Sequence, residues 1–245
     1  MSDIQYNILN LPSHISFADG NSIEYEYAAD GRKVRTTHTI NNNVTSTVYC
    51  GNAIYENGSL KMLLNESGYY SFQDNKFYFY LKDHQGNIRV VADEDGKVEE
   101  VNDYYPFGGL MFNAGDDTQP YKYNGKELDQ KGGLDWYDYG ARYYDAAIGR
   151  WHAVDPMVEM YYSESPYVYC VNNFVNKVDP TGCFSTKFGA WLYKLFNGGD
   201  QILKDVGGEY FVSTQIVHSD DEVEVVVNRK FDWDGRNTGR NLAIE

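Results

Sequence analysis

The sequence has little of what builds disulfide-stabilised, membrane-spanning or nucleic-acid-binding proteins. Only 3 of its 245 residues are cysteines, and their odd number and wide separation at Cys50, Cys170 and Cys183 exclude a disulfide framework and a Cys-x-x-Cys metal pair. No apolar run approaches the roughly 18 residues of a membrane span, and residues 1–17 lack the basic start and apolar middle of a signal peptide. We therefore expect no membrane span, and secretion or display at the cell surface only as part of a longer exported protein.

Positive charge is also scarce. The formal net charge at pH 7 is -15, because 21 lysine and arginine side chains stand against 36 aspartates and glutamates. Such a chain repels a phosphate backbone unless a local basic patch overrides the repulsion, and the sequence has no such patch. An acidic stretch at Asp220, Asp221 and Glu222 near His218 lacks the spacing of metal ligands and fits a solvated turn better. We therefore predict no nucleic-acid partner, no metal site and no cofactor.

Proline is rare, with 6 residues, whereas tyrosine and glycine number 23 each. Tyrosine is favoured on half-buried strands, and glycine supplies the positive φ angles of tight turns. As far as about Phe107, short segments rich in Tyr, Val and Ile alternate with turn signals, which predicts a string of antiparallel hairpins and a mainly β fold. These turn signals are Asp19-Gly20, Asp30-Gly31, Asn57-Gly58, Asp74-Asn75, Gln85-Gly86-Asn87 and Asp95-Gly96.

Two of the hairpin segments resemble each other. Ile23–Thr37 and Phe77–Asp93 share an aromatic-x-aromatic strand, a polar turn ending in glycine, and an apolar residue close to an arginine. Repetition of this kind suggests an array in which each hairpin buries its face against its neighbours. Chance similarity among tyrosine-rich hairpins is the alternative.

Five further segments between residues 78 and 182 are more specific. They read, in order, YLKDHQGNIRVVADEDGKV, DYYPFG, YKYNGKELD, LDWYDYGARYYDAAIGRWHAVDP and SPYVYCVNNFVNKVDPTG. Together they resemble the Rhs-repeat-associated core domain of bacterial Rhs/YD-repeat proteins. On this basis the chain divides into YD-repeat-like β-hairpins (1–77), the core domain (78–183) and a variable C-terminal tail (184–245).

The resemblance implies a β-rich shell. Family members wind YD-repeat hairpins into a hollow cocoon that encapsulates a variable C-terminal segment, often a toxin, and the core domain closes its end. Too few hairpins precede the core domain here to enclose a payload. We therefore expect the C-terminal end of a longer protein, the product of a truncated gene, or a subunit that needs a partner. The partners it implies are the chain's own tail, the remaining shell segments and an immunity protein.

Two Asp-Pro pairs are the candidates for chemistry. Asp155 and Asp179 lie 24 positions apart, and Arg142 precedes the first by 13. Two carboxylates that a fold brings together share a proton, so one can activate water while the other protonates a leaving group, and a guanidinium can hold them. The structural alternative stays open, because Asp-Pro-x-Gly is also an ordinary turn and Arg142 can stack on Tyr143 or Tyr144.

In many members of the resembling family, the core domain is an aspartyl autoprotease that cuts just after its final Asp-Pro-x-Gly. The resemblance therefore implies catalytic roles for Arg142, Asp155 and Asp179 and a cut between Cys183 and Phe184. This sequence departs from the family pattern twice. The first aspartate is followed by Pro-Met-Val without the glycine, and Cys183 stands where many cleaving relatives carry leucine.

Cys183 is also a weaker candidate in its own right. A nucleophilic thiol needs a neighbouring base, and His152 and His218 are the possibilities along the chain. A buried or solvent-facing thiol without a catalytic role is the simpler reading.

The tail has a different texture. Thr186–Val206 places apolar residues at helical spacing, with Ile202 and Leu203 in a second short helical stretch, and Tyr210–Val217 with Val223–Val227 predicts a hairpin. We therefore expect a short α+β tail. Its 7 basic and 10 acidic side chains suit a nuclease poorly. A packing segment is the leading interpretation, and a small effector of unknown activity is the alternative.

Overall fold

The computed structural model describes residues 1–115, 119–160, 163–183, 201–204, 210–219 and 222–231. Within these ranges the regular structure consists of β-strands and four 3-10 turns, and there is no α-helix. None of the helices in this part of the chain is long and apolar enough to cross a membrane. The predicted mainly β fold is confirmed.

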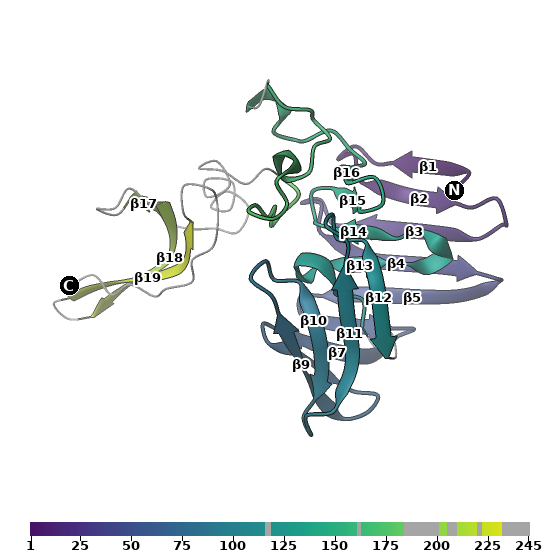
Figure 1. Cartoon of the computed structure of the whole chain (residues 1–245), viewed down its shortest axis with the longest axis horizontal. Helices are drawn as coiled ribbons and strands as arrows, with labels where there is room; N and C mark the ends of the chain where they lie inside the picture. The colour runs from purple at the N-terminus through teal and green to yellow at the C-terminus, as the bar shows by residue number, and fades with distance from the viewer. Residues whose placement is uncertain (116–118, 161–162, 184–200, 205–209, 220–221, 232–245) are drawn as a thin grey trace.

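One antiparallel sheet of twelve strands dominates the molecule, and each strand pairs with the next along the chain (Figure 1). This arrangement confirms the predicted string of hairpins. The strands are β1 (Asp3–Tyr6), β2 (Pro12–Ser16), β3 (Ser22–Tyr27), β4 (Lys33–Ile40), β5 (Asn43–Cys50), β6 (Ala53–Glu56), β7 (Ser59–Asn65), β8 (Gly68–Ser71), β9 (Lys76–Lys82), β10 (Ile88–Asp93), β11 (Val98–Tyr104) and β12 (Leu110–Gly115).

The same turn recurs along this sheet. Gly20 donates its backbone N–H to the carbonyl of Phe17 at 3.1 Å, and Gly86 donates to Asp83 at 3.0 Å in the same way. The φ angles of the two glycines are 87° and 81°, in the region that a side chain disfavours. Every predicted turn pair falls between two strands. The turn at Asn41-Asn42, between β4 and β5, was not predicted, because two asparagines take the positive φ angles there without a glycine.

A second antiparallel sheet contains β13 (Glu127–Asp129), β14 (Trp136–Asp138), β15 (Tyr143–Asp145) and β16 (Arg150–Trp151). The 3-10 turn η1 (Tyr123–Gly125) precedes it, and η2 (Lys131–Gly133) joins its first two strands. The turns η3 (Val158–Met160) and η4 (Cys170–Asn172) follow it. The strands are short, so this sheet depends on packing for its stability.

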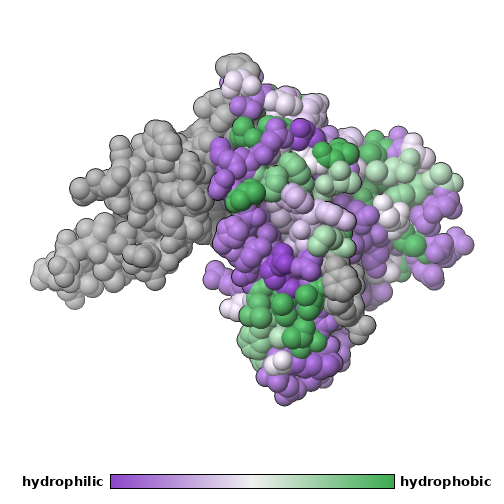
Figure 2. Space-filling model, in the orientation of Figure 1, coloured by the Kyte–Doolittle hydropathy of each residue, from purple (hydrophilic) through white to green (hydrophobic). Residues whose placement is uncertain are grey.

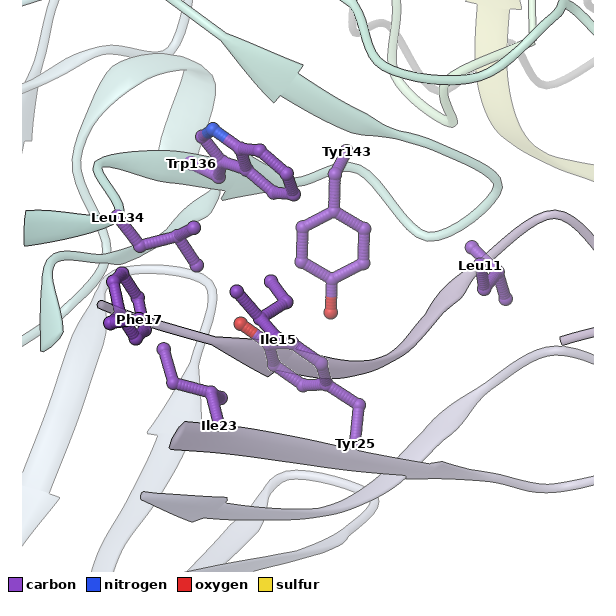
Figure 3. Packing of buried hydrophobic residues seen from close by; sticks show 8 residues of the cluster. All are labelled: Leu11, Ile15, Phe17, Ile23, Tyr25, Leu134, Trp136 and Tyr143. Atoms are coloured by element: carbon purple, nitrogen blue, oxygen red, sulfur yellow. The ribbon is translucent and has the colours of Figure 1, made fainter. Parts of the chain in front are cut away.

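A buried cluster joins the two sheets. Figure 3 shows Trp136 and Tyr143 of the small sheet facing Ile15 and Tyr25 of the large sheet. The rings of Tyr25 and Tyr143 lie 5.4 Å apart, and Ile15 and Trp136 are fully buried. Burying side chains of this size contributes about 1.5–3 kcal/mol each. The complete cluster comprises Leu11, Ile15, Phe17, Ile23, Tyr25, Leu134, Trp136 and Tyr143.

Buried charges also join the two sheets. Nζ of Lys33 on β4 lies 3.0 Å from Oε2 of Glu127 and 2.8 Å from Oδ2 of Asp138. The lysine side chain is only 8% exposed, although its sequence context, next to an Asp-Gly turn, suggests a surface residue. On the same strand, Nε2 of His38 lies 3.0 Å from a carboxylate oxygen of Asp129. These polar contacts connect the small sheet to β4.

A third sheet lies within the tail and contains β17 (Gln201–Lys204), β18 (Tyr210–Ser219) and β19 (Glu222–Phe231). The hairpin predicted within the tail is confirmed. The helical prediction for Ile202 and Leu203 is wrong, because both pair with β18 as strand residues. A short apolar run fits either period, and backbone pairing with a neighbour decides between them. The rest of the predicted helical stretch, 186–200 and 205–206, lies outside the described residues. The boundaries 1–77, 78–183 and 184–245 stay predictions.

Candidate active site

Arg142, Asp155 and Asp179 come from three different segments and meet beyond the small sheet. Arg142 lies in the turn between β14 and β15, where its carbonyl accepts a hydrogen bond from the N–H of Tyr139 at 3.1 Å. Asp155 follows β16 and donates its N–H to the carbonyl of Pro166 at 3.1 Å. The predicted convergence of these three residues is therefore a feature of the structure.

The guanidinium of Arg142 is the centre of the site. Its Nη2 donates to Oδ2 of Asp155 at 2.8 Å and lies 3.6 Å from Oδ2 of Asp179. Nη1 donates to the carbonyl of Pro166 at 3.1 Å, and Nε donates to the carbonyl of Gly182. Arg142, Asp155 and Asp179 are only 1%, 4% and 2% exposed. One buried cation thus holds two carboxylates and the backbone beside the expected cut.

Asp179 folds the last turn before that cut. Its Oδ1 accepts hydrogen bonds from the N–H of Thr181 at 3.1 Å and of Gly182 at 2.8 Å. Gly182 has a φ of 77°, and a Cβ there would lie 3.0 Å from the backbone nitrogen of Arg142. The glycine of Asp-Pro-x-Gly is therefore needed for both its φ angle and its lack of a side chain.

The first Asp-Pro turn forms without a glycine. Oδ1 of Asp155 accepts the N–H of Met157 at 2.7 Å, and the backbone carbonyl of Asp155 accepts the N–H of Val158 at 3.0 Å. The departure from the family pattern at this position therefore does not prevent the aspartate from reaching Arg142.

Burial shifts the pKa values of two groups in the site. It raises the pKa of Asp179 above its ordinary value, with Arg142 opposing the shift and the neighbouring charge of Asp155 adding to it. Burial also lowers the pKa of Arg142, although an arginine stays protonated at neutral pH. Oδ2 of Asp155 and Oδ2 of Asp179 can be no further apart than the sum of their distances to Nη2. That sum is about twice the length of a hydrogen bond, so a single water can reach both carboxylates.

The thiol of Cys183 lacks the features of a nucleophile. The residue is 4% exposed, and burial raises the pKa of its thiol to about 12, with the charges of Asp179 and Asp155 adding to the shift. His152 lies elsewhere, with its ring 3.6 Å from that of Trp136 and its Nε2 3.5 Å from Asp145. Phe184 and the side chain of His218 lie outside the described residues.

In the described part of the chain, no group of three or more His, Cys, Asp or Glu side chains could hold a metal ion. Asp220 and Asp221, which the sequence associates with His218, are not among the described residues.

Three participants in the site were missed from sequence. The ring of Trp151 lies 4.3 Å from Cζ of Arg142, the carbonyl of Pro166 accepts from Nη1, and the hydroxyl of Thr181 donates to the carbonyl of Cys183 at 3.2 Å. The only available signal was the position of Thr181 within Asp-Pro-x-Gly. A carbonyl contact and a ring stacked on a guanidinium leave no pattern in one sequence.

No protein-family model matches the chain. Among curated proteins, salivary gland surface protein 1 of Aedes aegypti is 41% identical over 114 residues, which cover 45% of this chain and 3% of the relative. The tRNA3(Ser)-specific nuclease WapA of Bacillus spizizenii is 28% identical over 191 residues, which cover 71% of this chain and 8% of the relative. Toxin subunit YenC2 of Yersinia entomophaga is 39% identical over 72 residues, which cover 27% of this chain and 7% of the relative.

Solved structures share the fold. The crystal structure of TcdB2-TccC3-Cdc42 superposes with a TM-score of 0.61 at 21% identity, over 74% of this chain and 10% of that chain. The Photorhabdus luminescens Tc holotoxin pore gives a TM-score of 0.59 over the same shares. The chain thus spans at most a tenth of these proteins. Similarity to toxin subunits, together with this fold, supports an Rhs-like chain, and the assignment of the core domain stays a prediction.

Proposed function

We propose that this chain is the closing end of an Rhs-type shell and that it cuts itself after Cys183 as an aspartyl autoprotease. The observation that carries the proposal is the convergence of Arg142, Asp155 and Asp179 in a buried site. The guanidinium of Arg142 also binds the carbonyl of Gly182, immediately before the residue whose peptide bond would be cut. An ordinary turn would have no need of a buried arginine that binds both carboxylates.

The geometry favours different roles for the two carboxyl groups. We assign the proton to Asp179, because burial raises the pKa of its carboxyl group and its Oδ2 lies 3.6 Å from Nη2 of Arg142, beyond a direct hydrogen bond. Asp155 accepts the direct hydrogen bond from Arg142 and serves as the base. Asp155 takes a proton from water, whose oxygen attacks the carbonyl carbon of Cys183. Asp179 then gives its proton to the amide nitrogen of Phe184 as the C–N bond breaks, leaving a carboxyl group and an amine.

The edge of the large sheet supports a role within a larger shell. Among the described strands, none pairs with the outer edge of β1. An unpaired edge exposes backbone donors and acceptors that a further hairpin can satisfy. We propose remaining shell segments as the partner at this edge, and an immunity protein as a partner only where the tail is toxic.

The outer face of β9 supports a second contact. Phe77, Phe79 and Leu81 alternate along this strand and are 47%, 47% and 59% exposed. Figure 2 shows a hydrophobic surface over the lower end of the large sheet, where β9 and β10 lie in Figure 1. A contiguous apolar surface marks a contact site. In the proposed shell this face meets the chain's own tail or other shell segments.

A second candidate function is delivery of the tail as a small effector. It is favoured by the relatives, which include a tRNA-specific nuclease and a toxin subunit. Expressing residues 184–245 in host cells, with and without the rest of the chain, would test it. Growth arrest that depends on the tail supports this candidate, and normal growth in both cases counts against it.

The autoprotease is tested by intact-mass measurement of the purified chain. We expect two fragments separated after Cys183 in place of the 28.1 kDa chain, and a full-length chain for Asp155→Asn and for Asp179→Asn. Asp93→Asn is a matched control, because Asp93 is also buried, at 3% exposed, but pairs with Lys76 of the neighbouring strand β9 and not with Arg142. A wild-type chain that stays at full length would rule out the autoprotease.

A further inference from the structure

The carbonyl oxygen of Cys183 has a side-chain hydrogen-bond donor. Oγ1 of Thr181 lies 3.2 Å from this oxygen, and Cys183 itself is 4% exposed. Attack of water on the carbonyl carbon moves negative charge onto this oxygen, so the contact lies where charge develops in the proposed reaction. A turn residue with a free choice of rotamer could have directed its hydroxyl to solvent.

Hydrogen bonds hold the backbone around Thr181 in place. Its N–H donates to Oδ1 of Asp179 at 3.1 Å, and its carbonyl accepts the N–H of Ala141 at 3.1 Å. The next residue, Gly182, is held by Asp179 through its N–H and by Arg142 through its carbonyl. Threonine is stiff at χ1, because it is branched at Cβ. These contacts fix the backbone from which the hydroxyl projects, and the hydroxyl also lies within hydrogen-bond reach of the Cys183 thiol.

The hydrogen bonds of Arg142 and of Oδ1 of Asp179 in the described part of the chain go to groups other than the carbonyl of Cys183. The nitrogens of Arg142 donate to the carbonyls of Gly182 and Pro166 and to the carboxylate of Asp155. Asp179 uses Oδ1 to accept two backbone N–H groups. Within the described part of the chain, Thr181 is the residue seen to donate to the carbonyl oxygen of Cys183.

We propose that Thr181 is a catalytic residue whose hydroxyl stabilises the oxyanion formed on the carbonyl of Cys183. This inference rests on the proposed autoproteolysis and adds an electrophilic group to its two carboxyl groups. The variable position of Asp-Pro-x-Gly thereby acquires a role, and a residue with a hydroxyl there favours cleavage. Removing one donor from an oxyanion hole slows a reaction by about 10²–10³-fold, and we expect the lower end of that range.

The test follows cleavage of the full 245-residue chain during a pulse of labelled cell-free synthesis. Thr181→Val keeps the shape of the side chain without the hydroxyl, Thr181→Ser keeps the hydroxyl, and Asp155→Asn is the inactive control. We expect Val to slow cleavage by about 10²-fold and Ser to stay within a few-fold of wild type. Urea unfolding midpoints show whether the variants fold. If the Thr181→Val variant does not fold, Thr181→Ala is measured in its place.

The outcomes separate the two proposals. If the wild-type chain is cut and the folded variant without a hydroxyl is cut equally fast, the role of Thr181 is overturned and the autoprotease stands. Slow cleavage in both Thr181→Val and Thr181→Ser also counts against a catalytic role of the hydroxyl, because the shape of the turn would then explain the loss. If the wild-type chain stays intact, both proposals fall.

Discussion

Nη2 of Arg142 and Oδ2 of Asp155 are 2.8 Å apart, and both side chains are almost completely excluded from solvent. Such a pair is costly to desolvate, so it adds little net stability over apolar residues of the same shape. Replacing only one of the two partners is strongly destabilising, because the charge of the other partner stays buried without compensation.

Replacing Arg142 tests this interpretation. Arg142→Met leaves Asp155 and Asp179 without a cation, and we expect a loss of about 3–5 kcal/mol in the free energy of unfolding, with loss of cleavage. Arg35→Met is the control, because Arg35 pairs with Glu26 on the surface, with side chains 47% and 57% exposed. A surface pair of this kind contributes about 0–1 kcal/mol. Urea titration measures the free energy of unfolding of both variants. Equal losses would show that the buried Arg142 contributes no more than the surface Arg35.

The glycine of the last turn can be tested against a glycine of similar backbone geometry. Gly182 and Gly133 have φ angles of 77° and 74°, so an alanine at either costs about 1–2 kcal/mol. A Cβ at Gly182 also meets the nitrogen of Arg142 at 3.0 Å, whereas nothing lies within 4 Å of one at Gly133. We expect Gly182→Ala to destabilise the chain by about 1–3 kcal/mol more. Thermal unfolding of the two variants compares them directly, and similar melting temperatures would refute the close approach.

Asp179 predicts a pH dependence of stability. Its folded pKa is raised above its ordinary value of 3.8, so the native chain holds this proton more tightly than the unfolded chain. The stability that this proton contributes is complete below the ordinary pKa and is lost as pH rises through the folded pKa. Asp179→Asn lacks this loss, so the stability of wild type relative to the variant should fall as pH rises from 3.8. Urea unfolding of both proteins over a pH series upward from 3.8 measures this difference in stability. A difference that rises with pH would contradict a raised pKa of Asp179.

Cleavage should follow the same proton. The rate should fall as pH rises through the folded pKa of Asp179, because the leaving amide nitrogen then lacks its donor. Rates from pulse-labelled chains over a pH series would show this decline. A rate that increases steadily with pH would contradict the assignment of the proton to Asp179.

Lys33 provides a prediction away from the site. Lys33→Met leaves the partly buried carboxylates of Glu127 and Asp138, 19% and 15% exposed, without their shared cation, and we expect a loss near the lower end of about 3–5 kcal/mol. Lys61→Met is the control, because Lys61 pairs with Glu56 at a more open position, with side chains 30% and 32% exposed. If the two variants unfold at the same urea concentration, the charges between the two sheets do not position them.

The hairpins could be predicted because their signals are local. An Asp-Gly pair between tyrosine-rich segments specifies a turn whatever surrounds it, as at Asp30-Gly31. The prediction was wrong at Ile202 and Leu203, where a short apolar run fits a helix and a strand alike and pairing with β18 decides. Asn41-Asn42 was missed because asparagine takes positive φ less often than glycine does.

The candidate site was only partly visible. The family resemblance, together with the two Asp-Pro pairs, pointed to Arg142, Asp155 and Asp179, and the structure brings these three together. Spacing alone could not separate a catalytic pair from two ordinary turns. Thr181 and Trp151 went unnoticed, because a hydroxyl and a ring acquire their roles only from what they touch.

Alternation of tyrosine with polar residues, and glycine at the turns, already dictate a β-hairpin array from the amino acids alone. Only the folded chain decides that Lys33 is buried between two sheets, or that Arg142 reaches Asp155 and Asp179. The physical reason is range. A turn depends on the φ angles of adjacent residues, whereas a buried ion pair depends on where distant segments of the chain are packed.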